Sequence, residues 1–135
     1  MHTDLKLILE CVTPSTGLQI TIHDRTDILA TVNDISQIET ELNFKVSIPN
    51  QLTFVIENSN SNTVTLKKCS LGGLEITTSM LNQICNFTPS GASEPIVTTN
   101  WWQDGKVVID FFAGDWVQYH LLYGNKIIVY HDAQN

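Results

Sequence analysis

The chain has 135 residues and a formal net charge of −7, with 42% apolar and 16% charged residues. This length favours one domain spanning residues 1–135, and the composition excludes an intrinsically disordered chain, which would be poorer in apolar residues. Seven basic residues against 14 acidic ones argue against a nucleic-acid partner and a basic membrane anchor, because both require clustered positive charge. No apolar run is long enough for a membrane-spanning helix, and the N-terminus does not resemble a signal peptide.

The composition indicates strands rather than helices. Val, Ile and Thr together number 39 and Ala numbers 4, and β-branched residues suit a pleated sheet whereas alanine is the best helix former. The three cysteines, Cys11, Cys69 and Cys85, are an odd number without CxxC spacing, which favours buried, reduced thiols over a disulfide framework. We therefore expect an all-β domain made in a reducing cytoplasm.

In the first half of the chain, apolar and polar residues alternate with the period of two that is typical of half-buried strands. This pattern predicts strands at residues 5–11, 18–22, 28–32, 42–48, 52–56 and 63–70. The charged stretch His23–Asp27 is expected to be a loop, and Pro49-Asn50-Gln51 is expected to be the turn of a hairpin. Gly72-Gly73 predicts a bulge or tight turn before residues 74–76.

The second half of the chain contains the one predicted helix, Thr77–Cys85, with Thr78 or Ser79 as its cap. Asn86–Pro95 is expected to be a loop. Asp104-Gly105 predicts a tight type I′ turn that joins a strand at 97–102 to one at 107–112. Two further strands are predicted at residues 116–121 and 126–131, so that about nine strands and one short helix form an antiparallel β-sandwich.

No catalytic motif is present, and the histidines lack the HxH and HExxH spacings of zinc sites. We therefore predict a protein that is not an enzyme, with no cofactor and no metal site. A calcium site remains an alternative, because Asp24, Asp27 and Asp34 bracket one short strand and calcium prefers carboxylate oxygens. The other interpretation of these residues is that their side chains cap backbone amides in turns.

The most informative feature is the pair Trp101-Trp102 beside Asp104. Neighbouring side chains of a strand point to opposite faces, so one indole is expected in the core and the other at the surface. An exposed indole can anchor a protein interface or stack against a sugar ring. Trp116 and Tyr119, on the next predicted strand, are candidates to extend this surface. The alternative is that the second ring packs against the 86–95 loop or the helix.

The order of elements resembles small β-sandwich proteins of the jelly-roll or carbohydrate-binding-module type that tailed bacteriophages of aquatic bacteria encode. The resemblance is carried mainly by the C-terminal half: the strand 64–74 with Gly72-Gly73, the short helix 78–85, and the segments Trp101–Gly105 and Tyr123–Asn125. It implies a place in the virion and contacts with other virion proteins.

Two functions are therefore expected from the sequence. The first is a protein-binding β-sandwich, a structural or decorating subunit of a phage capsid, neck or tail that contacts other virion proteins or its own copies. The second is a carbohydrate-binding module, with or without calcium. In either case the predicted contact residues are Trp101, Trp102, Asp104, Trp116 and Tyr119.

Overall fold

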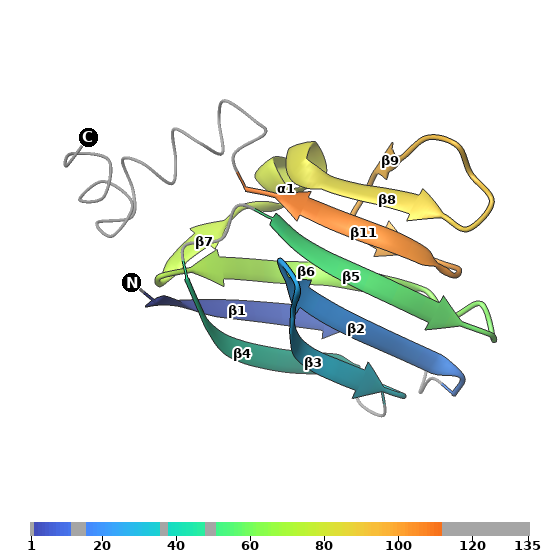
Figure 1. Cartoon of the computed structure of the whole chain (residues 1–135), viewed down its shortest axis with the longest axis horizontal. Coiled ribbons are helices and arrows are strands. Elements are labelled where there is room, and N and C mark those ends of the chain that lie inside the picture. The colour runs from blue at the N-terminus through green and yellow to red at the C-terminus, as the bar shows by residue number, and fades with distance from the viewer. Residues whose placement is uncertain (1, 12–15, 36–37, 48–50, 112–135) are drawn as a thin grey trace.

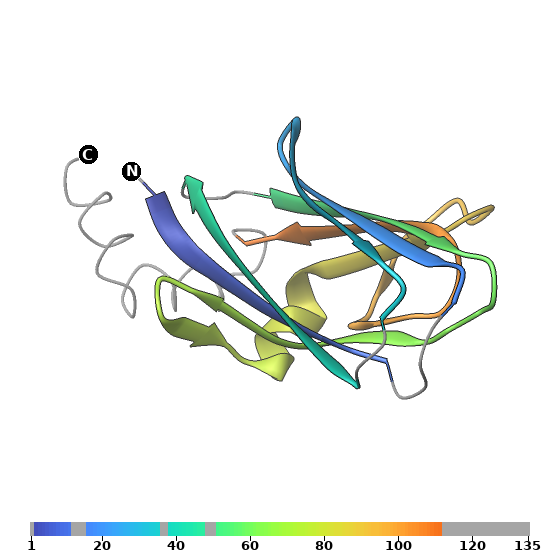
Figure 2. The same cartoon turned by 90° about the horizontal axis from the view of Figure 1, so that it is seen from below.

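The computed structural model describes residues 2–11, 16–35, 38–47 and 51–111, which form two antiparallel β-sheets and one short helix. Figures 1 and 2 show the sheets stacked as two layers. This arrangement confirms the predicted antiparallel β-sandwich with one short helix. The predicted strands at 116–121 and 126–131 lie outside the described residues.

The first sheet, called sheet A, has the strand order β10-β6-β1-β4, and β7 also pairs with β6. Its strands are β1 (His2–Glu10), β4 (Glu39–Ser47), β6 (Val64–Leu71), β7 (Leu74–Ile76) and β10 (Asn100–Trp101). β6 and β7 are joined at Gly72 and Gly73, whose φ angles are 61° and 83°. These angles confirm the predicted turn. They also explain why glycine stands at both positions, since other residues adopt such angles only rarely.

The second sheet, called sheet B, has the order β3-β2-β5-β11-β8-β9. Its strands are β2 (Leu18–Asp24), β3 (Asp27–Asn33), β5 (Gln51–Asn58), β8 (Cys85–Pro89), β9 (Ile96–Val97) and β11 (Gly105–Asp110). β2 shows why these residues form a half-buried strand: its side chains alternate strictly between buried and partly exposed. The buried ones are Leu18, Ile20, Ile22 and Asp24.

The hydrophobic core lies between the two sheets. Leu5, Leu7 and Leu9 of β1 enter it from sheet A, while Phe54 and other residues of β5 enter it from sheet B. The rings of Phe54 and Trp101 meet edge to face, with centroids 5.3 Å apart. This contact joins the middle of sheet B to the edge of sheet A. The three cysteines are buried thiols, as predicted.

Helix α1 (Thr78–Ile84) connects the two sheets, because it follows β7 of sheet A and leads into β8 of sheet B. Its cap is Thr77 rather than Thr78 or Ser79: the Thr77 hydroxyl accepts the Met80 N–H at 3.3 Å. Leu81 and Ile84 are its buried residues. Among the described residues, α1 is too short to cross a membrane, and no span was found.

Both predicted hairpins around Pro49-Asn50-Gln51 and Asp104-Gly105 are wrong. β4 pairs with β1 in sheet A, whereas β5 pairs with β2 and β11 in sheet B. Likewise β10 pairs with β6, and β11 pairs with β5 and β8. Both connections cross from one sheet to the other. The alternation of apolar and polar residues cannot reveal this, because it indicates which side chains are buried and not which strand is the partner.

The role predicted for Gly105 is also wrong. It is absent from the residues with positive φ, so it does not serve a type I′ turn. A Cβ at this position would lie 2.5 Å from the Thr88 carbonyl oxygen and 2.7 Å from the Phe87 ring. Glycine is needed here because β8 approaches closely, not because of the backbone angle.

Two predicted loops are shorter than expected. The stretch 86–95 contains most of β8, which runs to Pro89 before the turn begins. At His23–Asp27, β2 continues to Asp24 and β3 starts at Asp27, so that only Arg25 and Thr26 form the turn. Cross-strand pairing extends strands into residues whose composition suggests a loop.

Candidate functional site

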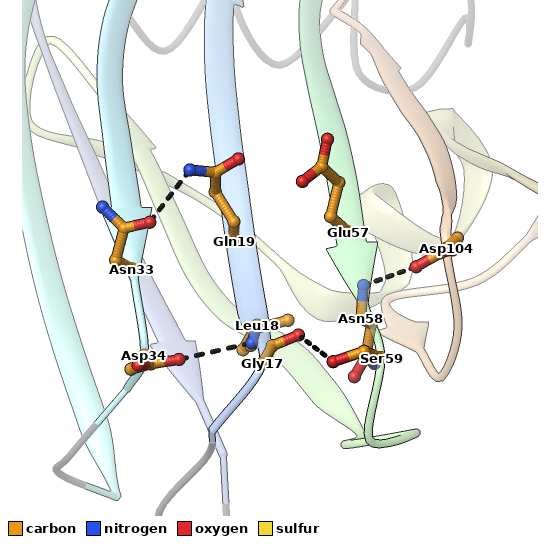
Figure 3. Close-up of a pocket in the computed structure, with 9 residues that line it drawn as sticks. All are labelled: Gly17, Leu18, Gln19, Asn33, Asp34, Glu57, Asn58, Ser59 and Asp104. Atoms are coloured by element: carbon orange, nitrogen blue, oxygen red, sulfur yellow. Dashed lines mark hydrogen bonds between the residues drawn. The ribbon is translucent and has the colours of Figure 1, made fainter.

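A polar pocket of about 560 Å³ opens at one end of sheet B, where β2 and β11 begin and β3 and β5 end. Figure 3 shows its lining. The residues are Gly17, Leu18, Gln19, Asn33, Asp34, Glu57, Asn58, Ser59 and Asp104. They come from four separate stretches of the chain, so sheet order brings them together.

One wall of the pocket forms where Gly17 meets the turn after β5. The Ser59 N–H donates to the Gly17 carbonyl oxygen at 2.9 Å, and the Ser59 hydroxyl donates to the same oxygen at 3.2 Å. Gly17 has a φ of 72°, and a Cβ on it would lie 2.2 Å from Ser59 Oγ. The backbone angle therefore favours glycine, and a Cβ here would also displace the Ser59 hydroxyl from the Gly17 carbonyl oxygen.

At the floor of the pocket, Asn58 forms hydrogen bonds with both Asn62 and Asp104. It is buried, with 6% of its surface exposed. Its side-chain oxygen accepts the Asn62 N–H at 2.9 Å, and its side-chain nitrogen donates to the Asn62 carbonyl at 2.5 Å. The Asn58 backbone N–H donates to Asp104 Oδ1 at 2.5 Å, so one oxygen of Asp104 is held in place beside the pocket.

The opposite wall is formed by the ends of β2 and β3. Asp34 and Leu18 exchange two hydrogen bonds: Asp34 N–H to Leu18 O at 2.9 Å, and Leu18 N–H to Asp34 Oδ1 at 3.3 Å. Gln19 Nε2 donates to Asn33 Oδ1 at 2.9 Å. This pair orients two planar amides side by side and leaves the Gln19 oxygen and the Asn33 nitrogen for a ligand.

The lining supplies three carboxylates, Asp34, Glu57 and Asp104, and no lysine or arginine. Asp34 and Asp104 each hold a backbone N–H, whereas Glu57 is exposed and makes no hydrogen bond or ion pair with a described residue. The pocket can therefore accept hydrogen bonds from hydroxyl or amine groups at several positions and donate at fewer.

The structure separates the tryptophan pair as predicted. Trp101 is fully buried and its Nε1 donates to the Thr98 carbonyl oxygen at 3.2 Å, so it cannot contact a partner or a sugar, and its place among the contact residues is corrected. Trp102 is 38% exposed and lies edge to face against Phe87, with ring centroids 5.1 Å apart. Part of its ring is therefore available at the surface.

The other predicted contact residues have different outcomes. Asp104 lines the polar pocket. Trp116 and Tyr119 lie outside the described residues. Trp102 does not line this pocket; it is one of the exposed large apolar residues, as are Ile96 and Val97 of β9.

The three aspartates considered for calcium do not converge. Asp24 and Asp27 face each other at one end of the β2–β3 hairpin, whereas Asp34 follows the other end. A strand of this length spans about 20 Å. No group of three or more His, Cys, Asp or Glu side chains among the described residues is arranged to hold a metal ion.

No direct signal in the sequence indicates the site residues Gln19, Asn33, Glu57, Asn58 and Ser59. Each looked like an ordinary outward-facing or turn residue. The available signal was that several polar residues stand where predicted strands begin or end, at 17–19, 33–34 and 58–59. The strand order needed to place those ends side by side is not encoded in the local pattern.

No protein-family model and no curated protein matches this sequence. Two solved structures are similar in fold. One is the selenomethionine form of vCBM60, described in work on "two families of calcium-dependent carbohydrate binding modules", with a TM-score of 0.59, 8% identity, and coverage of 80% of this chain and 90% of that chain. The other is "vCBM60 in complex with galactobiose", with a TM-score of 0.59, 7% identity, and coverage of 79% and 97%.

At this level of identity the similarity establishes the fold. The chain is an antiparallel β-sandwich of the kind found in carbohydrate-binding modules. Fold alone does not transfer a ligand, since one sandwich architecture supports many functions. Among the described residues no three carboxylates gather around one point, so these side chains do not indicate a carboxylate-rich calcium site.

Proposed function

We propose that this protein is a non-catalytic glycan-binding module whose contact surface is the polar pocket at the end of sheet B. The observation that carries the proposal is the lining of planar amides and carboxylates in an open pocket on this fold. Sugar hydroxyls are best recognised by such groups, because each can donate or accept hydrogen bonds in a defined plane.

The Gln19–Asn33 pair is central to this proposal. Its internal hydrogen bond of 2.9 Å fixes the orientation of both amides before a ligand arrives. The Gln19 oxygen can accept from one hydroxyl and the Asn33 nitrogen can donate to another. Preorganised groups bind more tightly because less side-chain freedom is lost on association.

A glycan array followed by calorimetry with the best ligand tests the proposal, with galactobiose included as a neutral probe. We expect Gln19→Ala and Asn33→Ala each to weaken binding about fivefold, the effect of losing one hydrogen bond. Asn43→Ala is the matched control. Asn43 is an exposed amide on sheet A that donates to Glu41 at 3.1 Å, and its loss should leave the affinity unchanged.

The proposal fails if no glycan on the array binds, or if Asn43→Ala weakens binding as much as the two pocket variants do. Calcium is tested in the same titrations. Because the pocket side chains contact the sugar directly in this proposal, we expect the same affinity in EDTA and in added calcium. A loss of binding in EDTA would show that the ligand is held through a metal and not by this lining alone.

A second candidate is the protein-binding subunit of a phage particle expected from the sequence. Exposed Trp102, Ile96 and Val97 favour it, because such residues are enriched in protein interfaces. Light scattering of the wild type and of Trp102→Ala, together with mass spectrometry of purified particles, tests this function. A chain that stays monomeric and is absent from particles would reject it.

A further inference from the structure

The carboxylates on the outer face of sheet A and those of the pocket on sheet B have different partners. On sheet A the acidic side chains that form ion pairs lie beside lysines: Lys6 with Glu41 at 3.1 Å, and Lys45 with Asp4 at 2.8 Å. Lys67 lies 3.1 Å from Glu10 and 2.9 Å from Glu39. Hydrogen bonds from the Asn43 amide and from Lys6 lower the pKa of Glu41.

The carboxylates of the pocket on sheet B have no such partners. No ion pair joins a described lysine or arginine to Asp34, Glu57 or Asp104. No described lysine or arginine lines the pocket. Among the described residues, two backbone N–H groups donate hydrogen bonds to these carboxylates, one to Asp34 and one to Asp104. The pocket therefore carries local negative charge on a chain whose net charge is already −7.

The three pocket carboxylates are not gathered around one point, because no group of three or more His, Cys, Asp or Glu side chains among the described residues is arranged to hold a metal ion. Figure 3 shows Asp34 and Asp104 on opposite sides with Glu57 above them. A ligand that compensates charges spread in this way must carry its own positive groups along its length.

From this arrangement, and resting on the proposed glycan-binding function, we infer that the pocket selects glycans by charge. Oligosaccharides with free, protonated amino groups bind more tightly than neutral ones, and oligosaccharides with carboxylate groups bind most weakly. An ammonium group donates charge-assisted hydrogen bonds to carboxylates, whereas a uronate is repelled and would leave the pocket oxygens without donors.

The test is calorimetry with three soluble oligosaccharides of equal length: glucosamine oligomers with free amines, the same oligomers N-acetylated, and galacturonate oligomers. We expect the affinities to fall in that order, with about a tenfold difference between the first and the last. The difference should shrink as ionic strength rises, because salt screens exposed charges. Glu57→Gln should reduce the ratio of amine to N-acetyl affinity by about twofold to fivefold.

Glu41→Gln is the matched control, because it removes one carboxylate from the ion-paired face of sheet A. It should leave the three affinities in the same ratio. Equal binding of all three oligomers, or a ratio that Glu57→Gln does not change, would overturn the charge selection while leaving glycan binding intact. No binding of any of the three, together with a blank glycan array, would instead reject the proposed function and this inference with it.

Discussion

At the scale of single residues, burial decides the chemistry of two thiols. Cys69 is fully buried on β6, and Cys85 is fully buried at the start of β8. Burial raises the pKa of each from an ordinary 9.0 to about 12, and the neighbouring Cys85 contributes to the shift at Cys69. A thiol that stays protonated is a poor nucleophile. These cysteines therefore act as small core residues.

This burial predicts slow alkylation in the folded protein. Iodoacetamide at pH 8 should leave Cys69 and Cys85 unmodified, and the same treatment in guanidinium should label both, as peptide mass spectrometry can measure. The folded state holds these protons up to about pH 12, whereas the unfolded chain releases them near 9.0. Stability should therefore fall as the pH rises through this interval. Rapid labelling of either thiol in the native protein would contradict the prediction.

Asp24 is a buried acidic residue without adequate compensation. It is 7% exposed, and its Oδ1 has no hydrogen-bond partner in the part of the chain that the structure describes. It also faces Asp27 across the β2–β3 ladder, and like charges opposite each other destabilise a strand pair. The position therefore favours a neutral side chain.

We expect Asp24→Asn to raise the free energy of unfolding by about 1–2 kcal/mol, because it replaces a buried acidic side chain that faces a second acid across the ladder. Chemical denaturation at pH 7 measures the change. Asp27→Asn is the control: Asp27 is exposed, so its substitution relieves the repulsion alone and should have a smaller effect. A loss of stability in Asp24→Asn would show that the carboxylate forms a favourable contact.

At the scale of elements, the position of β11 depends on one glycine. Gly105 pairs with Ile56 of β5 and Pro89 of β8, at the start of the strand between them. The Thr88 carbonyl oxygen and the Phe87 ring occupy the space where a Cβ would lie. Any side chain at this position must separate β11 from β8.

We therefore expect Gly105→Ala to cost about 2 kcal/mol of stability and to speed amide exchange along the β8–β11 ladder. Gly91→Ala is the control, because its Cβ would meet nothing within 4 Å although its φ is 88°. That variant should lower the free energy of unfolding by about 1 kcal/mol because of backbone strain. It should leave amide exchange along the β8–β11 ladder as slow as in the wild type. Unchanged exchange in Gly105→Ala would refute the close approach of β8.

At the scale of the whole molecule, Trp101 joins the two sheets. It lies at the edge of sheet A, is fully buried, and contacts Phe54 of sheet B. Its neighbour Trp102 is 38% exposed and contacts the core through the ring of Phe87. Adjacent residues of the same type therefore have separate roles, one in folding and one at the surface.

Trp101→Ala should destabilise the protein by about 3–5 kcal/mol, the usual cost of a large cavity in a core. Trp102→Ala should cost less than about 1 kcal/mol, because its ring is partly exposed. Thermal melting of the two variants compares them directly. Similar losses in both would mean that Trp102 is as much a core residue as Trp101.

The local pattern of the sequence determined where most strands lie and which of their residues are buried. Alternation placed Leu5, Leu7 and Leu9, then Leu18, Ile20 and Ile22, on inward faces, and all six are buried. The predicted range of α1 was correct to within one residue at each end although its cap was misplaced, and turn chemistry located the Gly72-Gly73 turn. These features depend on the period of the backbone and on the residues next to one another, which a sequence records directly.

Only the tertiary structure decided which strands are partners and therefore which polar residues form a site. The same alternation in β4 and β5 is compatible with a hairpin, yet the two strands belong to different sheets. The pocket exists because Gly17, Asn33, Asn58 and Asp104, far apart in the chain, meet at one end of sheet B. Strand order is set by how the whole core packs, and no local pattern records that global choice.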